Sequence, residues 1–142
     1  MVESIPMIAE AFQDGLKAIE KKDSSKIKAS DTRKLSGSVY LDEKLKGDYP
    51  HDARWDYIIG YDEKVYFAEV HPANTSNVDE VIKKKNWLAS WLNAYAKVLK
   101  DNMVTTSYHW LASGKIAILK NSPQYRRLAK NKLILCKELK LG

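Results

Sequence analysis

The chain of 142 residues has little cysteine, glycine and proline: one, six and four residues respectively. The single cysteine, Cys136, excludes an intrachain disulfide and any zinc site built from several cysteines, and it favours a reducing compartment. No Pro- or Gly-rich stretch divides the sequence, so we expect a single domain over residues 1–142. Because 44% of the residues are hydrophobic, that domain has enough apolar side chains for a proper core.

Signals for export and for membrane insertion are also missing. The amino terminus has no basic region followed by an apolar stretch and a small-residue cleavage site, and no apolar run approaches the length of a membrane span. We therefore expect a cytoplasmic protein without a membrane partner. A Gly-rich phosphate loop, a nucleophile elbow and an internal repeat are absent as well, so the sequence does not point to the classes that these motifs mark.

The charge balance favours an anionic partner. The sequence has 24 basic and 18 acidic residues, a net charge of +6 and a pI near 9.3. The most concentrated cationic element is the segment 125–132. We expect its basic residues to contact the phosphates of a nucleic acid, and a merely solvated helix face is the alternative. These residues are Arg126, Arg127, Lys130 and Lys132.

Two apolar runs, residues 55–61 and 64–70, flank Asp62-Glu63 and predict a β-hairpin with a two-residue loop. Counting outward from the loop pairs Tyr61 with Lys64, Ile59 with Tyr66 and Tyr57 with Ala68. The next pair is Asp56 opposite Glu69. Like charges placed opposite each other need a raised pKa, a basic neighbour or a bound cation, and a hard divalent metal is the simplest answer.

The alternation of side chains along a strand puts this acidic pair at the end of an apolar face. Glu69 and His71 share a side with Val65, Phe67 and Ile58. The alternative is that the two acids lie at a solvated sheet edge, where they balance Arg54 or a lysine.

A long helix is predicted after the hairpin, because apolar residues from Val78 to Leu99 recur at helical spacing. Ser76 is the expected N-cap, with Asp79 three residues further on. Lys84 and Lys85 both lie within the apolar half of this helix. We choose Lys85 as the lysine aimed at the acids, although the angle alone does not separate the two, and the alternative is that both lysine stems pack while their heads reach water.

The remaining elements follow from apolar spacing and turn residues. We expect a helix over residues 5–22, a loop over 23–33 and a short strand over 38–41. After the long helix come a strand over 105–112, ended by Ser113-Gly114, and a short basic helix with Ser122 as N-cap and Pro123 in its first turn. Residues 132–141 are expected to form a last strand.

Asp56, the run Glu69-Val70-His71 on the next strand, and a helix with inward lysines resemble the PD-(D/E)XK nuclease superfamily, which has the restriction-endonuclease-like fold. The match in element order covers residues 5–112. The resemblance implies an α/β fold with an αβββαβ core and a central mixed sheet flanked by helices, to which an additional C-terminal helix and strand are added. It also implies that Asp56, Glu69 and the carbonyl of Val70 bind Mg²⁺ or Mn²⁺.

This sequence has His71 where the motif of that family has its lysine. The family is known to let the basic residue move to the following helix, so the resemblance gives Lys85, or else Lys84, the task of activating or positioning the attacking water. His71 is a second candidate base because histidine titrates near neutral pH, and it is also a candidate metal ligand. The structural alternative is a strand-terminal residue bonded to backbone. A further acid for a second ion, Glu20 or Asp52, is left unassigned.

Two functions follow. The first is metal-dependent hydrolysis of phosphodiester bonds in nucleic acid, with DNA as the first choice and Asp56, Glu69, His71 and Lys85 as catalytic residues. The second is a catalytically inactive nuclease-fold module for nucleic-acid binding or protein assembly, in which Trp87 and Trp91 dock a partner. A homodimer and a larger defence or repair assembly both stay open.

Overall fold

A computed structural model gives the backbone of residues 1–142 and the side chains of 1–104 and 108–142. The chain has an α/β fold built on a five-stranded mixed sheet in the order β2-β3-β4-β5-β6. Neighbours are antiparallel from β2 to β4 and parallel from β4 to β6. The strands of this sheet are β2 (Leu35–Tyr40), β3 (Tyr57–Tyr61), β4 (Lys64–Ala73), β5 (Met103–Ile116) and β6 (Leu133–Cys136).

The β3–β4 hairpin forms in the predicted register. Tyr57 pairs with Ala68, Ile59 with Tyr66 and Tyr61 with Lys64. The loop is the expected two residues, Asp62 and Glu63, and both have positive φ, at 49° and 62°. Positive φ at both central residues is the geometry of the type I′ turn, whose twist matches that of the flanking strands.

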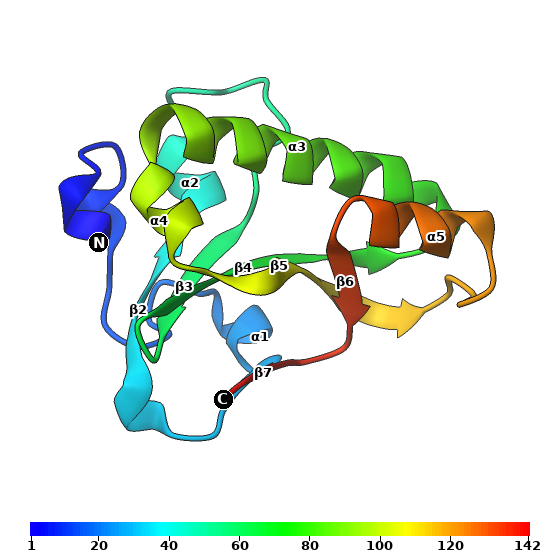
Figure 1. Ribbon diagram of the computed structural model, residues 1–142, viewed down its shortest axis with the longest axis horizontal. Coiled ribbons are helices and arrows are strands. Elements are labelled where there is room, and N and C mark those ends of the chain that lie inside the picture. The colour runs from blue at the N-terminus through cyan, green and yellow to red at the C-terminus, as the bar shows by residue number, and fades with distance from the viewer.

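Most of the helices cover one face of the sheet (Figure 1). The helix α3 (Val78–Tyr95) crosses from β4 to β5, and α5 (Pro123–Lys130) crosses from β5 to β6. Buried side chains of α3, of the short helices α2 (Leu41–Leu45) and α4 (Lys97–Asp101) and of the sheet form the larger core cluster. This cluster includes Phe67 and Trp110, which are fully buried. The side chains that point to this face therefore meet α3.

The opposite face is covered by a smaller layer. A two-stranded parallel sheet of β1 (Ile27–Ala29) and β7 (Leu139–Leu141) lies there, and the short helix α1 (Lys21–Ser24) precedes it. Leu139 and Leu141 pack with Ile27 and with the outward side chains of β3 in a second buried cluster. The last residues of the chain thus close this face.

The helix expected over residues 5–22 does not form, so the first helix of the αβββαβ order is absent as predicted. Two short 3₁₀ turns occur instead, η1 (Val2–Ser4) and η2 (Ala9–Ala11). Gln13 then pairs with Ser38 beside β2, and Gly15 takes a positive φ of 55°. The apolar residues are buried, but Ile5 and Ile8 belong to one core cluster and Ile19 to the other. A single helix lies on one face of a sheet, whereas this segment passes from one face to the other.

Four further boundaries differ from prediction. The region 23–33 is not a plain loop, since it holds β1 and the turn η3 (Thr32–Lys34). The long helix begins after the turn η4 (Thr75–Asn77), which Asn74 rather than Ser76 caps, and it breaks at Ala96, where φ is −140°. The strand β5 continues through Ser113-Gly114, because its pairing with β4 extends to Ile116 opposite Ala73. The last strand is divided between β6 and β7.

The start of α5 agrees with prediction. Ser122 accepts a hydrogen bond from the Tyr125 N–H at 3.2 Å, and Pro123 occupies the first turn. None of the helices in the described part of the chain is both long enough and apolar enough to cross a membrane.

Candidate functional site

The acidic pair lies at the end of the hairpin opposite its turn. Asp56 and Glu69 stand one position beyond the last paired residues, Tyr57 and Ala68. The backbone N–H of Asp56 donates to Oε1 of Glu69 at 3.0 Å, and the N–H of Val70 donates to Oδ2 of Asp56 at 3.0 Å. Two carboxylates are thus exchanged for the ladder hydrogen bonds at this point, and both strands hold the acids together.

Glu69 is fully buried, and Lys84 of α3 is its principal partner. The Nζ of Lys84 donates to Oε2 of Glu69 at 2.6 Å, and the lysine side chain is only 17% exposed. Burial opposes charge on Lys84, but the nearby carboxylates of Glu69 and Asp56 outweigh this effect and raise the pKa of the lysine. Lys84 is therefore a firmly charged ammonium group inside the site.

Lys85, our choice from the sequence, does not reach the acids. Its Nζ lies 5.5 Å from the centre of the Tyr108 ring and within 3.4 Å of Oδ1 of Asn86. Consecutive helix residues point about 100° apart, so only one of the two lysines reaches the sheet at Glu69. The inward position belongs to Lys84, which lies four residues after Glu80 and four before Leu88.

His71 joins the acids to the first turn of α3. Its Nδ1 lies 3.5 Å from Oε2 of Glu69, and its Nε2 lies 3.2 Å from Oε2 of Glu80. The interaction with Glu69 raises the pKa of His71 despite partial burial and the neighbouring Lys84. Glu80 is a member of the site that the sequence analysis missed, although its place one helical turn before Lys84 was a usable signal.

Asp56 carries the strongest perturbation of the site. Burial, followed by the charge of Glu69, raises the pKa of Asp56 to about 8. Lys84 and the Val70 N–H act in the opposite direction without cancelling this effect. A carboxyl group held in this way has a high affinity for a positive charge, whether a proton or a cation.

An open cleft of about 380 Å³ reaches Asp56 from the face that carries α1. Glu20 and Tyr40 line it, and the Tyr40 hydroxyl donates to Oε1 of Glu20 at 2.7 Å. Asp52, the other unassigned acid, lies elsewhere and accepts a hydrogen bond from Nε1 of Trp87 at 3.0 Å. Of the two, Glu20 is the one that shares a cleft with Asp56.

The donor atoms suit a hard divalent cation, since Asp56, Glu69 and the Val70 carbonyl all offer oxygen. The buried carboxyl of Asp56 at the mouth of an open cleft supports this fit. Among the side chains that the structure describes, however, no group of three or more His, Cys, Asp or Glu residues is arranged around one cation position. Lys84 supplies the positive charge beside Glu69.

The basic segment lies beside the site rather than in it. Arg127 forms an ion pair with Asp79 of α3 at 2.6 Å, and Arg126 donates to the carbonyl of Asn121 at 3.1 Å. Lys130 is exposed, and no ion pair involves it in the part of the chain whose side chains are described. Lys132 lies close enough to Lys85 to lower the pKa of that lysine, after the larger effect of burial.

The arrangement combines an acidic pair, a charged lysine and a histidine bridged by a second glutamate. It can bind a cation at the carboxylates, and it can hold or transfer a proton at His71. Comparison of the chain with protein-family models, with curated proteins and with solved structures gives no match.

Proposed function

We propose that this protein is a metal-dependent nuclease of the PD-(D/E)XK type that hydrolyses phosphodiester bonds in nucleic acid, with DNA as the first substrate to test. One observation carries the proposal: Lys84 Nζ lies 2.6 Å from Glu69, on the strand beside Asp56. An aspartate, a glutamate and a lysine then meet at the end of one hairpin. The lysine comes from the following helix, the position to which this family is known to move it.

The topology supports the restriction-endonuclease-like part of the proposal. Three antiparallel strands, β2, β3 and β4, are followed by the crossover helix α3 and by β5, which lies parallel to β4. The acids lie at the start of the second strand and within the third. The helix that opens the core in this family is replaced here by short turns, and Glu20, at the end of that segment, faces the same cleft as Asp56.

Each residue has a distinct role in the proposed reaction. Asp56, Glu69 and the Val70 carbonyl would hold Mg²⁺ or Mn²⁺, which when bound stabilises negative charge on the phosphate oxygens. Lys84 orients the attacking water and favours its deprotonated form. His71, fixed between Glu69 and Glu80, is placed to take up or release a proton.

The second function, a catalytically inactive binding or assembly module, has an observation in its favour as well. Both oxygens of Glu69 already have partners: Oε1 accepts from Asp56, and Oε2 lies against Lys84 and His71. The acid is thus neutralised by protein groups alone. In this alternative, the partner would meet the ring pair formed by Trp87 and Trp91, whose centres are 6.2 Å apart.

The test is nicking of supercoiled plasmid DNA and cleavage of single-stranded DNA with Mg²⁺ or Mn²⁺. We expect Glu69→Gln and Lys84→Met to lower the rate by on the order of 100-fold or more. Lys85→Met is the matched control, because it removes a neighbouring lysine that does not touch the acids, and it should retain most of the activity.

Circular dichroism and thermal unfolding of each variant separate a loss of chemistry from a loss of fold. The proposal fails if the wild type cleaves neither substrate and Mn²⁺ does not raise its unfolding temperature. Equal activity of wild type and Glu69→Gln would also contradict it, since a contaminating nuclease would then be the source.

A further inference from the structure

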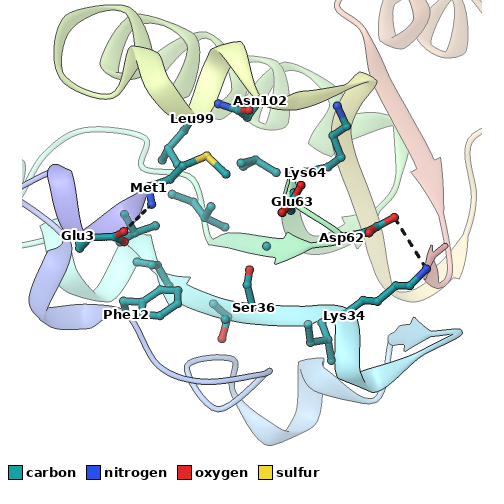
Figure 2. Close-up of a pocket in the computed structure, with 18 of the residues that line it drawn as sticks. Met1, Glu3, Phe12, Lys34, Ser36, Asp62, Glu63, Lys64, Leu99 and Asn102 are labelled. Carbon is teal, nitrogen blue, oxygen red and sulfur yellow. Dashed lines mark ion pairs between the residues drawn. The ribbon is translucent and has the colours of Figure 1, made fainter.

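The largest cavity in the described structure lies at the turn end of the β3–β4 hairpin, away from the acidic pair (Figure 2). Its volume is about 850 Å³. Its walls come from β2, β3, β4, the N-terminal segment and the end of α4. Gly60 in its floor is four residues beyond Asp56, or about 13 Å along the strand at about 3.3 Å per residue. The cavity is therefore a separate site.

Two glycines on neighbouring strands leave its floor without side chains. Gly37 of β2 pairs with Gly60 of β3, and Gly60 pairs on its other side with Val65 of β4. A Cβ atom added at Gly60 would lie 2.2 Å from the Ser36 hydroxyl, and one added at Gly37 would lie 2.2 Å from the Phe12 ring. Glycine inside a strand permits another group to approach the backbone closely.

The protein itself uses one of these glycines to seat an aromatic ring. Phe12 lies directly over Gly37 at the edge of the cavity and remains 37% exposed. Its exposed ring forms one wall, and the apolar side chains of Val39, Ile58 and Leu99 form the bottom. A second flat ring laid over Gly60 would meet Phe12 at its edge and these side chains beneath it. The shape thus selects a planar apolar group.

The rim carries one cation that has no acidic partner. Lys34 pairs with Asp62 at 4.0 Å, and Arg33 pairs with Asp31 at 3.0 Å. Lys64 lies at the rim near Asn102, as Figure 2 shows, and among the described side chains no carboxylate lies within ion-pair distance of it. A negative group on the ligand would find its counter-charge at this lysine.

We propose that this cavity binds a small planar aromatic molecule that carries one negative charge, with its ring over Gly60 and its anionic group at Lys64. Ser36 and Asn102 supply hydrogen bonds to polar atoms on the ring. The site is independent of the acidic pair, and its occupation does not require the protein to be a nuclease.

Anilinonaphthalene sulfonate, a planar aromatic sulfonate whose fluorescence rises on binding, is the probe. We expect saturable binding at one site on the folded protein. Closing the floor with Ser36→Ala plus Gly60→Val should weaken binding about tenfold or more, relative to Ser36→Ala alone. The Ser36→Ala background removes the hydroxyl that the new side chain would strike. Lys64→Ala should weaken binding about threefold.

Amide chemical shifts of the wild type give a readout that needs no substitution. The Gly37 and Gly60 amide resonances should move with the same concentration dependence as the fluorescence. The proposal is overturned if the wild type shows no saturable binding, or if the double variant binds as tightly as Ser36→Ala. Shifts confined to the exposed Tyr95 region would overturn it as well, because the probe would then be bound elsewhere.

Discussion

At the scale of single residues, Lys84 is the group on which the acidic pair depends. Glu69 has no exposed side-chain surface, and its closest positive charge is the Lys84 ammonium at 2.6 Å. When one partner of a buried ion pair is removed, the remaining charge has neither water nor a counter-charge. The neighbouring Lys85 lies over an aromatic ring and has no such partner to abandon.

We therefore expect Lys84→Met to lower the free energy of unfolding by about 3 kcal/mol or more, and Lys85→Met by less than about 1 kcal/mol. Urea unfolding of both variants at neutral pH measures the difference. Because methionine keeps most of the stem length, the comparison isolates the charge. Similar losses in the two variants would mean that Lys84 does not neutralise Glu69.

Asp56 makes stability depend on pH in a direction opposite to that of most acids. Its pKa is about 8 in the folded protein, against about 3.9 in an unfolded chain. Between these values only the folded state holds the proton, so the free energy of unfolding falls as the pH rises from about 4 to about 8. Below that range both states are protonated, and the contribution is fully present.

Asp56→Asn removes this dependence while its amide oxygen can still accept from the Val70 N–H. From pH 5 to pH 8, we expect the wild type to lose on the order of 1–3 kcal/mol more stability than the variant. Urea unfolding across this range is the measurement. Parallel curves for the two proteins would show that Asp56 is already ionised when folded. Saturating Mn²⁺ should also flatten the wild-type curve if the cation replaces the proton.

At the scale of elements, the hairpin turn is the most constrained local structure. Asp62 and Glu63 both adopt positive φ, which costs free energy for residues that have a Cβ atom. Glycine carries no such cost at the second turn position. The turn holds the register that places Asp56 beside Glu69 at the other end of the hairpin.

Glu63→Gly should therefore raise the free energy of unfolding by about 0.5–1 kcal/mol. Glu63→Ala is the matched control, because it removes the same carboxylate but keeps the Cβ atom. Thermal unfolding of the two variants compares them directly. If alanine stabilised the chain as much as glycine, loss of the charge rather than relief of the backbone would be the cause.

The hairpin is also the part of the fold that sequence predicted best. Its two-residue loop fixes the register, and alternation then fixes which side chains share a face. The N-terminal segment failed for the opposite reason. Ile5, Ile8 and Ile19 fit helical spacing, but two separate cores on opposite faces of the sheet bury them. Local spacing does not reveal which core a residue will join.

The choice between Lys84 and Lys85 has a similar explanation. Both positions lie on the apolar half of α3, and the decision depends on how the helix is rotated over β4. That rotation is set by tertiary packing, which Leu88 and Trp91 determine together with the sheet. The acidic pair could be predicted from one hairpin, whereas its basic partner depends on two elements that meet in space.

At the scale of the whole molecule, positive charge is concentrated in one part of the chain. Between Asp101 and Glu138 there are seven of the 24 basic residues and none of the 18 acidic residues. This stretch forms β5, α5 and β6, and it brings Lys132 close to Lys85 of α3. Like charges gathered without acids favour an anion with several charges, such as a nucleic-acid backbone.

If nucleic acid binds here, Lys130→Glu plus Lys132→Glu should weaken binding of a labelled single-stranded DNA of about 20 nucleotides, and should lower the salt slope by about 0.7 for each lost phosphate contact. Lys17→Glu plus Lys21→Glu changes the net charge equally in the N-terminal segment and serves as the control. Fluorescence anisotropy over a range of salt measures both. Equal weakening in the two double variants would assign the effect to net charge alone.

The pairing of β1 with β7 has a consequence for the order in which the molecule is completed. Residues about 110 positions apart in the chain meet there, at Ile27 and Leu139. During synthesis the sheet and the helices over its first face can assemble while the second face is still bare. That face, with Tyr57, Ile59 and Ile19, stays open to water or to a chaperone until residues 139–141 have emerged from the ribosome. The final strand therefore acts as the latch of a nascent chain, and nascent chains halted before it should be held by chaperones longer than finished ones.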